Sequence, residues 1–315
     1  MGYFSKQFYK GISLFIKTGI LILSVLYITH KINSSNLLEH FYNAHFYWSF
    51  FLVALSLVFI NWGIEAYKWQ FLIQRIEKLS FAKAYQSVLS GVTIGVFTPN
   101  RVGEFAGRVF YLESDNKVQA SLISFVGSAF QLLVTILIGL ISAVCIAFQN
   151  NAVKLTLVDL FTSIYFSIGF SLFALLIIVL FLFRKKIHEK YKKHVDVLYS
   201  YSYKELLKVF YLSLFRYLVF TIQYYLILKC MNLDLSFSLS FHLISLTFLV
   251  SSIIPTVAYT EMIVRGASAV YFFSFYVPDT SLVLAASLIV WLINLALPSC
   301  IGAFFIWRLK FFVSK

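Results

Sequence analysis

The chain has 315 residues, of which 60% are hydrophobic and 12% are charged, and its mean hydropathy is +0.85. Charged residues make up about a quarter of an average soluble domain, so this composition excludes an ordinary soluble protein. Apolar runs of about 20 residues recur, without the polar and apolar alternation of a β-barrel. The sequence therefore predicts an all-α polytopic membrane protein with one membrane domain over residues 1–315.

The formal net charge of +13 does not indicate a nucleic-acid partner, because the basic residues lie between apolar runs, where membrane topology places them. The three cysteines fall inside apolar runs without a short spacing, so neither a disulfide framework nor a zinc site is expected. No phosphate loop, metal-ligand cluster, catalytic triad or dinucleotide motif is present. We therefore expect no catalytic residue, metal or other cofactor.

Six apolar segments are long enough to cross a bilayer. A basic loop over residues 184–208 separates the fourth from the fifth, and polar side chains inside spans (Gln131, Gln223, Asn294) are expected to link helices. The predicted spans cover approximately residues 12–29, 47–67, 119–148, 160–183, 209–229 and 281–307.

Residues 86–112 form an apolar stretch that is interrupted by Pro99, Gly103 and several charged residues. The apolar run before Pro99 is too short to cross a membrane and return, since one span needs about 20 residues. Proline ends a continuing helix, and Thr98-Pro99 is typical of an N-cap followed by the first helical residue. We predict a re-entrant hairpin, with one half-helix entering and a second half-helix leaving.

The same pattern returns in residues 238–277, where Pro255 is followed by Glu261. An arginine stands four residues after the glutamate in both copies, as Glu104/Arg108 and Glu261/Arg265, and this spacing places the two side chains on one helix face. Thr260 is predicted to cap the second half-helix. Two such elements indicate a repeat.

The order span, span, hairpin, span occurs twice, over approximately residues 12–148 and 160–307, joined by a short external loop. Because each unit crosses the membrane three times, the second unit starts on the opposite side. This is an inverted-topology repeat, a pattern found in many secondary transporters. With both termini in the cytoplasm, 19 Lys and Arg residues fall in cytoplasmic segments and three outside. We therefore predict a multi-pass protein of the cytoplasmic (inner) cell membrane.

The segment Pro99-Asn100-Arg101-Val102-Gly103-Glu104, with Arg108 after it, resembles the P-x-R-x-G-E…R signature of the lysylphosphatidylglycerol synthase transmembrane region, a flippase-like family. The resemblance covers nearly the whole chain. Many members carry a glycine-rich run between the second proline and its glutamate, where this chain has residues 256–260. Because the resemblance covers only the membrane part of the full synthases, without their aminoacyl-transferring domain, it implies lipid translocation rather than lipid synthesis.

Ionisable residues at membrane depth usually face a partner, a cavity or a pathway. One interpretation is that Arg101, Arg108 and Arg265 bind a lipid phosphate, because the guanidinium fork donates two parallel hydrogen bonds. The half-helix N-termini at Thr98 and Thr260 would add backbone amide groups. The sequence thus predicts a substrate-binding site at the two hairpin tips.

Glu104 and Glu261 would orient these arginines, receive a basic head group or carry a coupling proton. The alternative is structural: each Glu/Arg pair neutralises itself and holds its hairpin in place. Arg216 either lines the cavity or extends to the cytoplasmic interface. Glu65 is predicted to pair with Lys68 or Arg75 at the interface.

Three functions are compatible with these residues. The first is a flippase or transporter that moves a membrane phospholipid or a lipid-linked head group. The second is an integral-membrane transferase with a glutamate as general base. The third is a scaffold for a separate lipid-modifying enzyme, and a homo-oligomer is possible in each case. We expect no nucleic-acid partner.

Overall fold

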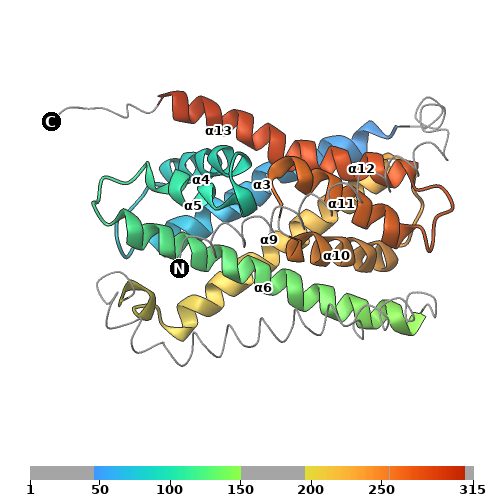
Figure 1. The fold of residues 1–315 in the computed structure, drawn as a ribbon, viewed down its shortest axis with the longest axis horizontal. Coiled ribbons are helices and arrows are strands. Elements are labelled where there is room, and N and C mark those ends of the chain that lie inside the picture. Colours follow the sequence, from blue (N-terminus) through green and yellow to red (C-terminus); the bar gives the residue numbers. More distant parts are fainter. Residues whose placement is uncertain (1–45, 150–195, 255, 309–315) are drawn as a thin grey trace, which may run out of the picture.

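The computed structural model describes residues 46–149, 196–254 and 256–308. The predicted spans at 12–29 and 160–183, and most of the basic loop 184–208, lie outside these residues. The described residues form helices without strands, as predicted (Figure 1). In chain order the elements are α3 (Trp48–Ile73), α4 (Phe81–Val96), η1 (Pro99–Arg101), α5 (Gly103–Val109), α6 (Lys117–Gln149), α9 (Tyr203–Cys230), α10 (Phe237–Ile253), α11 (Ala258–Phe273), α12 (Ser281–Trp291), η2 (Leu292–Ala296) and α13 (Leu297–Arg308).

Three of these helices are long and apolar enough to cross a membrane: α3, α6, and the continuous run from α12 through η2 to α13. They correspond to predicted spans 47–67, 119–148 and 281–307, although α3 extends to Ile73. α9 has 28 residues, which is also long enough, but it carries more charged residues and is not among the three. The predicted count of six spans and the membrane depth of the hairpins stay predictions.

The first broken helix consists of α4, a turn and α5. α4 begins after Ser80, whose hydroxyl accepts a hydrogen bond from the Lys83 N–H at 3.3 Å. Thr98 precedes η1 but makes no side-chain capping hydrogen bond to it, and the outgoing helix α5 begins at Gly103, four residues after the predicted start at Pro99. The Thr98 hydroxyl instead accepts the Gly103 N–H at 2.8 Å. A Cβ at Gly103 would lie 2.8 Å from the Ile94 carbonyl oxygen and from Thr98, so only glycine fits where the chain turns back.

The second broken helix consists of α10, an extended turn and α11. Ser236 caps α10 by accepting the Leu239 N–H at 3.3 Å. After Ile253 the chain is extended at Ile254 and again at Val257, the N-cap of α11. Pro255, the predicted breaker, lies outside the described residues. The break itself falls where the sequence places it.

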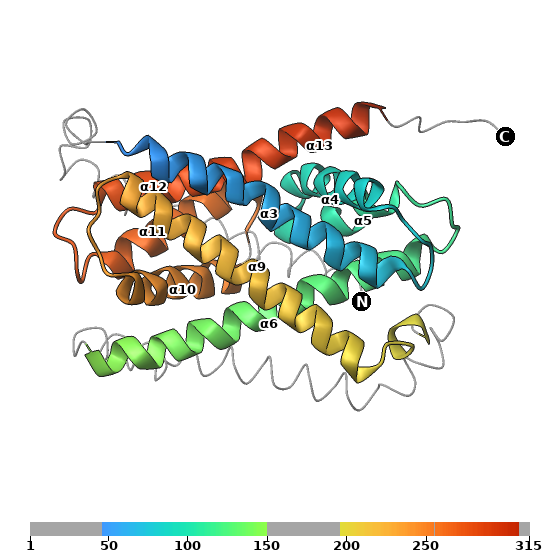
Figure 2. The same cartoon turned by 180° about the vertical axis from the view of Figure 1, so that it is seen from behind.

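The two broken helices lie toward opposite ends of the long axis of the molecule. Figures 1 and 2, which show the fold from opposite sides, both place α4 and α5 toward one end and α10 and α11 toward the other. α3 and α9 pack against each other and cross the middle of the molecule between them. The order long helix, broken helix, long helix therefore occurs twice in the described residues; that the halves form an inverted repeat stays a prediction.

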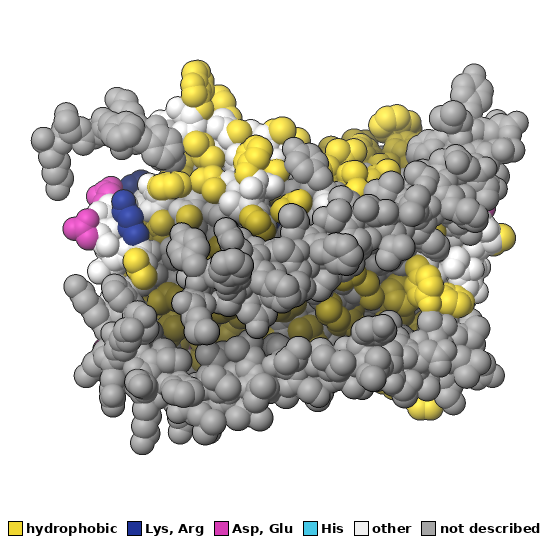
Figure 3. All heavy atoms as spheres, in the orientation of Figure 1, with side chains coloured by type: hydrophobic (Ala, Val, Ile, Leu, Met, Phe, Trp, Pro, Cys, Tyr) yellow, Lys and Arg dark blue, Asp and Glu magenta, His cyan; other side chains and the backbone are white. Residues whose placement is uncertain are grey.

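On the face shown in Figure 3, hydrophobic side chains are widespread over the described residues that are visible, and charged side chains gather at the end where α5 leads into α6. The polar residues inside the long helices link neighbours, as predicted: Gln131 donates to the Ser213 carbonyl at 3.3 Å, and Gln223 donates to the Ala54 carbonyl at 2.8 Å. Apolar outer side chains, with polar side chains paired inside, are typical of a protein whose flanks face lipid.

Candidate functional site

The tips of the two broken helices meet. The Asn100 N–H donates to the Thr256 carbonyl at 2.8 Å, and the Thr256 N–H donates to Asn100 Oδ1 at 3.0 Å. Asn100 and Arg101 both have left-handed backbone conformations, with φ of 51° and 56°. Asparagine tolerates this conformation better than most residues, but arginine does not, so the turn holds Arg101 in a strained position beside the second tip.

Glu65 of α3 is the centre of a buried ion-pair network. Its side chain is 2% exposed, and its carboxylate contacts Lys68 at 2.8 Å, Arg108 of α5 at 2.9 Å and Arg216 of α9 at 3.0 Å. Arg216 also donates to Asn61 Oδ1 at 2.9 Å. One carboxylate therefore joins α3, α5 and α9 behind the first tip.

Glu104 extends this network to the tip itself. Its carboxylate contacts Arg101 at 2.5 Å and Arg108 at 3.6 Å. The predicted Glu104/Arg108 pair therefore exists, but the nearer carboxylate of Arg108 is Glu65. Arg101 is the most open member of the network, with 28% of its side chain exposed.

The second tip carries a separate pair. Glu261 and Arg265 are 2.7 Å apart, as the spacing predicts. The Arg265 guanidinium lies over the rings of Phe220 and Phe248, at 5.6 and 5.7 Å from their centres. Glu261 is also close enough to Arg101 to attract it electrostatically. Both tips thus bring charged groups to the contact between them.

The predicted cap of the second half-helix is wrong. Thr260 is not the N-cap of α11, because the N-cap is Val257, three residues earlier. Its hydroxyl instead contacts the N–H and the carbonyl of Val257, both at 2.9 Å, inside the first turn. Of the two possibilities for Arg216, the structure shows an inward side chain held by Glu65, not one extended to an interface.

Sequence reasoning missed the role of Glu65. The predicted Lys68 pair is present, but the predicted interfacial position is wrong, because both side chains are buried. Arg75 pairs instead with Glu205. The available signal was a glutamate inside an apolar run, which is costly without partners. Its two arginine partners come from distant segments, so local spacing could not identify them.

The network reaches a defect in the last long helix. Asn61 donates to Asn294 Oδ1 at 3.2 Å, and Asn294 lies in the π-helical segment η2. Asn294 also donates to the Val290 carbonyl at 3.1 Å. π-Helical turns are often found at functional sites, because they turn a side chain out of the regular helical position. Here the turn directs a polar side chain to the network.

Comparison with protein families agrees with these motifs. A family model described as the lysylphosphatidylglycerol synthase TM region matches residues 14–302. The chain belongs to this family. Neither a curated protein nor a solved structure matched it. Membership in the lysylphosphatidylglycerol synthase TM family, together with the long apolar helices, makes the chain a multi-pass membrane protein associated with lipid biosynthesis or transport.

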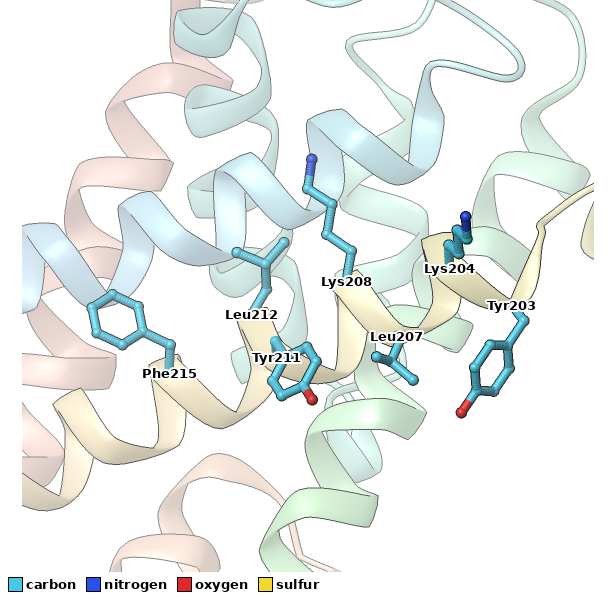
Figure 4. Close-up of a pocket in the computed structure, with 7 residues that line it drawn as sticks. All are labelled: Tyr203, Lys204, Leu207, Lys208, Tyr211, Leu212 and Phe215. Carbon is cyan, nitrogen blue, oxygen red and sulfur yellow. The ribbon is translucent and has the colours of Figure 1, made fainter.

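The structure also has a groove that lies away from the two tips. A shallow groove of about 510 Å³ follows one side of α9. In Figure 4 the Lys208 side chain reaches toward α3, where its amine donates to the Tyr67 hydroxyl at 3.0 Å. The groove is lined by Tyr203, Lys204, Leu207, Lys208, Tyr211, Leu212 and Phe215.

The start of α9 is fixed by an exposed carboxylate. Glu205 accepts hydrogen bonds from the N–H and hydroxyl of Ser202, at 2.8 and 2.9 Å, and pairs with Arg75 at 2.6 Å. The Ser202 hydrogen bonds, followed by Arg75, hold the pKa of Glu205 below its usual value. This pair lies outside the predicted spans and provides a reference for the buried ion pairs.

Proposed function

We propose that this protein moves a phosphate-bearing lipid between the two leaflets, and that the lipid phosphate binds where the two tips meet. The observation that carries the proposal is the direct contact between the tips beside Arg101. Arginine suits this task, because its planar fork donates two hydrogen bonds to a phosphate and remains charged. Glu104 and Glu65 then position the arginines rather than the substrate.

The arrangement of the broken helices supports a transport function. If the long axis of the molecule is the membrane normal, α4 and α5 enter from one side and α10 and α11 from the other, with their tips at the middle (Figures 1 and 2). Substrate sites in secondary transporters lie near the bilayer midplane, where interrupted helices meet. Both leaflets would then have a route to one site.

The surroundings of the tips suit a lipid rather than a soluble anion. Phe97 and Val102 flank the first turn and are 77% and 56% exposed, and Ile253 at the end of α10 is 64% exposed. The residues that flank the two turns thus expose apolar side chains. This combination matches a lipid, which carries its phosphate beside apolar chains.

A transferase is less well supported. A general base must be free to accept a proton from its substrate. Glu104 contacts two arginines, and Glu261 contacts Arg265. Both candidate bases are therefore engaged in holding cations.

The proposal is tested by lipid exchange in reconstituted vesicles. Fluorescent phosphatidic acid and phosphatidylglycerol are placed in both leaflets, and a membrane-impermeant quencher reports exchange. We expect wild-type protein to exchange at least one of these lipids and Arg101→Gln to fall to the rate of empty vesicles. Arg75→Gln is the matched control, because it removes an exposed arginine far from the tips, and it should exchange like wild type. Equal rates for wild type and Arg101→Gln with both lipids would refute the proposal. A scaffold protein would show the same rates for wild type and Arg101→Gln and would copurify with a stable enzyme partner.

A further inference from the structure

Charge is unbalanced in the network behind the first tip. Two carboxylates, Glu65 and Glu104, are in contact with four cations. The second tip does not share the imbalance, because its one glutamate pairs with one arginine. Among residues 46–149, 196–254 and 256–308, the network therefore has two positive charges in excess. Its cations are Lys68, Arg101, Arg108 and Arg216.

Deprotonation does not remove this excess. An arginine side chain stays charged in proteins. Lys68 has three oxygen atoms around its amine: Glu65 at 2.8 Å, the Gly127 carbonyl at 3.1 Å and the Ser213 hydroxyl at 3.4 Å. Three acceptors match the three donors of an ammonium group. All four cations are therefore assigned as charged.

The excess positive charge lies on poorly hydrated side chains, and two of these side chains have hydrogen-bond donors without a partner. The Arg108 side chain is 3% exposed, and its Nε has no hydrogen-bond partner among the described residues. The Nε of Arg101 is likewise buried without a partner in this part of the chain. An unpartnered buried donor and an unbalanced buried charge are both costly. An anion bound at the 28% exposed side of Arg101 would offset the excess positive charge.

We propose that the preferred ligand carries two negative charges on its head group, as a lipid phosphomonoester does. This inference rests on the proposed function and specifies its substrate class. A phosphodiester lipid such as phosphatidylglycerol has one negative charge and would leave one excess cation unbalanced. A phosphomonoester loses its second proton near pH 6, so it carries close to two charges above neutral pH. Inorganic phosphate shares this chemistry but lacks the apolar chains.

Binding to purified full-length protein in neutral detergent tests this inference. The probes are phosphatidic acid, phosphatidylglycerol with the same acyl chains, and inorganic phosphate, each titrated at pH 8 and pH 5. We expect phosphatidic acid to bind about tenfold more tightly than phosphatidylglycerol at pH 8, and the ratio to approach one at pH 5. Phosphatidylglycerol reports any titration of the protein groups near Arg101, which are Glu65, Lys68, Glu104 and Glu261. Inorganic phosphate should bind more weakly than either lipid.

Two variants change the charge balance without removing Arg101. Asn61→Asp places a carboxylate beside Arg216, whose Nε lies 2.9 Å from Asn61 Oδ1. Arg216→Gln removes one excess cation and serves if Asn61→Asp does not fold. Each variant should reduce the preference for phosphatidic acid to about threefold or less, because one excess charge remains. Arg75→Gln should leave the preference unchanged.

The possible failures are distinguishable. If wild type binds phosphatidylglycerol as tightly as phosphatidic acid, and Arg101→Gln weakens both, the charge inference is wrong and the proposed function stands. If the ratio is unchanged in both charge variants, the inference is also wrong. If inorganic phosphate binds as tightly as phosphatidic acid, the ligand is a free anion rather than a lipid. If Arg101→Gln changes neither the binding nor the exchange of lipid, the proposed function fails as well.

Discussion

The two tips use the same residue types in different ways. At the second tip Glu261 and Arg265 form an isolated pair at 2.7 Å, and the guanidinium lies over aromatic rings. At the first tip the same i, i+4 spacing leaves Glu104 and Arg108 farther apart, at 3.6 Å, because the Arg108 guanidinium lies closer to Glu65 of α3, at 2.9 Å. Spacing therefore places side chains on one face, but packing decides which partners they take.

This difference assigns different tasks to the tips. The first tip is connected to α3 and α9 through Glu65, and it carries the excess positive charge. The second tip is electrically balanced and contributes the Thr256 backbone to the contact. For the proposed phosphate site, the first tip would therefore supply most of the anion affinity, and the second tip packs against it.

The largest expected effect comes from removing the central carboxylate. Glu65→Ala leaves three cations without their shared partner, two of which (Lys68 and Arg108) are buried, so it should destabilise the protein by about 3–5 kcal/mol. Glu261→Ala strands only Arg265, so it should cost clearly less. Thermal unfolding in detergent measures both. Equal losses of stability would contradict the distinction between a shared network and an isolated pair.

A smaller effect is expected where α4 and α5 pack closely. A Cβ at Gly91 would lie 2.8 Å from the Glu104 carbonyl oxygen, so Gly91→Ala should cost about 1–3 kcal/mol. The matched control is Gly63→Ala in α3, where the nearest atom to an added Cβ is 4.0 Å away. The control should be stabilising by about 0.5–1 kcal/mol. If thermal unfolding shows stability changes of the same sign for both variants, the close approach of α4 to α5 at Gly91 is wrong.

Two substitutions of Asn100 distinguish the cost of backbone strain from the cost of losing the contact between the tips. Asn100→Gly keeps the left-handed conformation and loses only the bond to the Thr256 N–H, which should cost about 0.5–1.5 kcal/mol. Asn100→Ala should cost about 1–2 kcal/mol more, because alanine resists this conformation. Unfolding temperatures of the two variants decide the point. A glycine variant less stable than the alanine variant would rule out strain at this turn.

The smallest effect is expected at the exposed reference pair. Because the pKa of Glu205 is lowered on folding, its contribution is present above its ordinary pKa of 4.5 and is lost as the pH falls below that value. Glu205→Gln should therefore lower the melting temperature by about 1–2 °C at pH 7, and this difference should shrink as the pH falls below 4.5. A pH-independent difference would show that the carboxylate charge is not involved.

Much of the fold followed from local patterns. Proline and glycine residues mark the first break, although the outgoing helix begins at Gly103 rather than directly after Thr98. The Glu261/Arg265 pair followed from helical periodicity, which needs no knowledge of the rest of the fold. The start of α11 was misplaced at Thr260, because a threonine at the third helical position makes the same short-range hydrogen bonds as a cap.

The candidate site could be predicted only in part. The arginines are evident as charges in apolar surroundings, but the sequence predicts an interfacial Glu65, because this residue lies near the end of the predicted span 47–67. Its contacts with Arg108 and Arg216 depend on how α3, α5 and α9 pack. The π-helical turn at Asn294 likewise depends on packing, so no local sequence pattern predicts it.

Electron cryo-microscopy of the full-length protein in lipid nanodiscs that contain phosphatidic acid can locate the bound lipid. We expect phosphate density within hydrogen-bond distance of the Arg101 guanidinium, beside the Asn100–Thr256 contact. Phosphate density confined to the α9 groove near Lys204 and Lys208, with nothing at Arg101, would contradict this expectation.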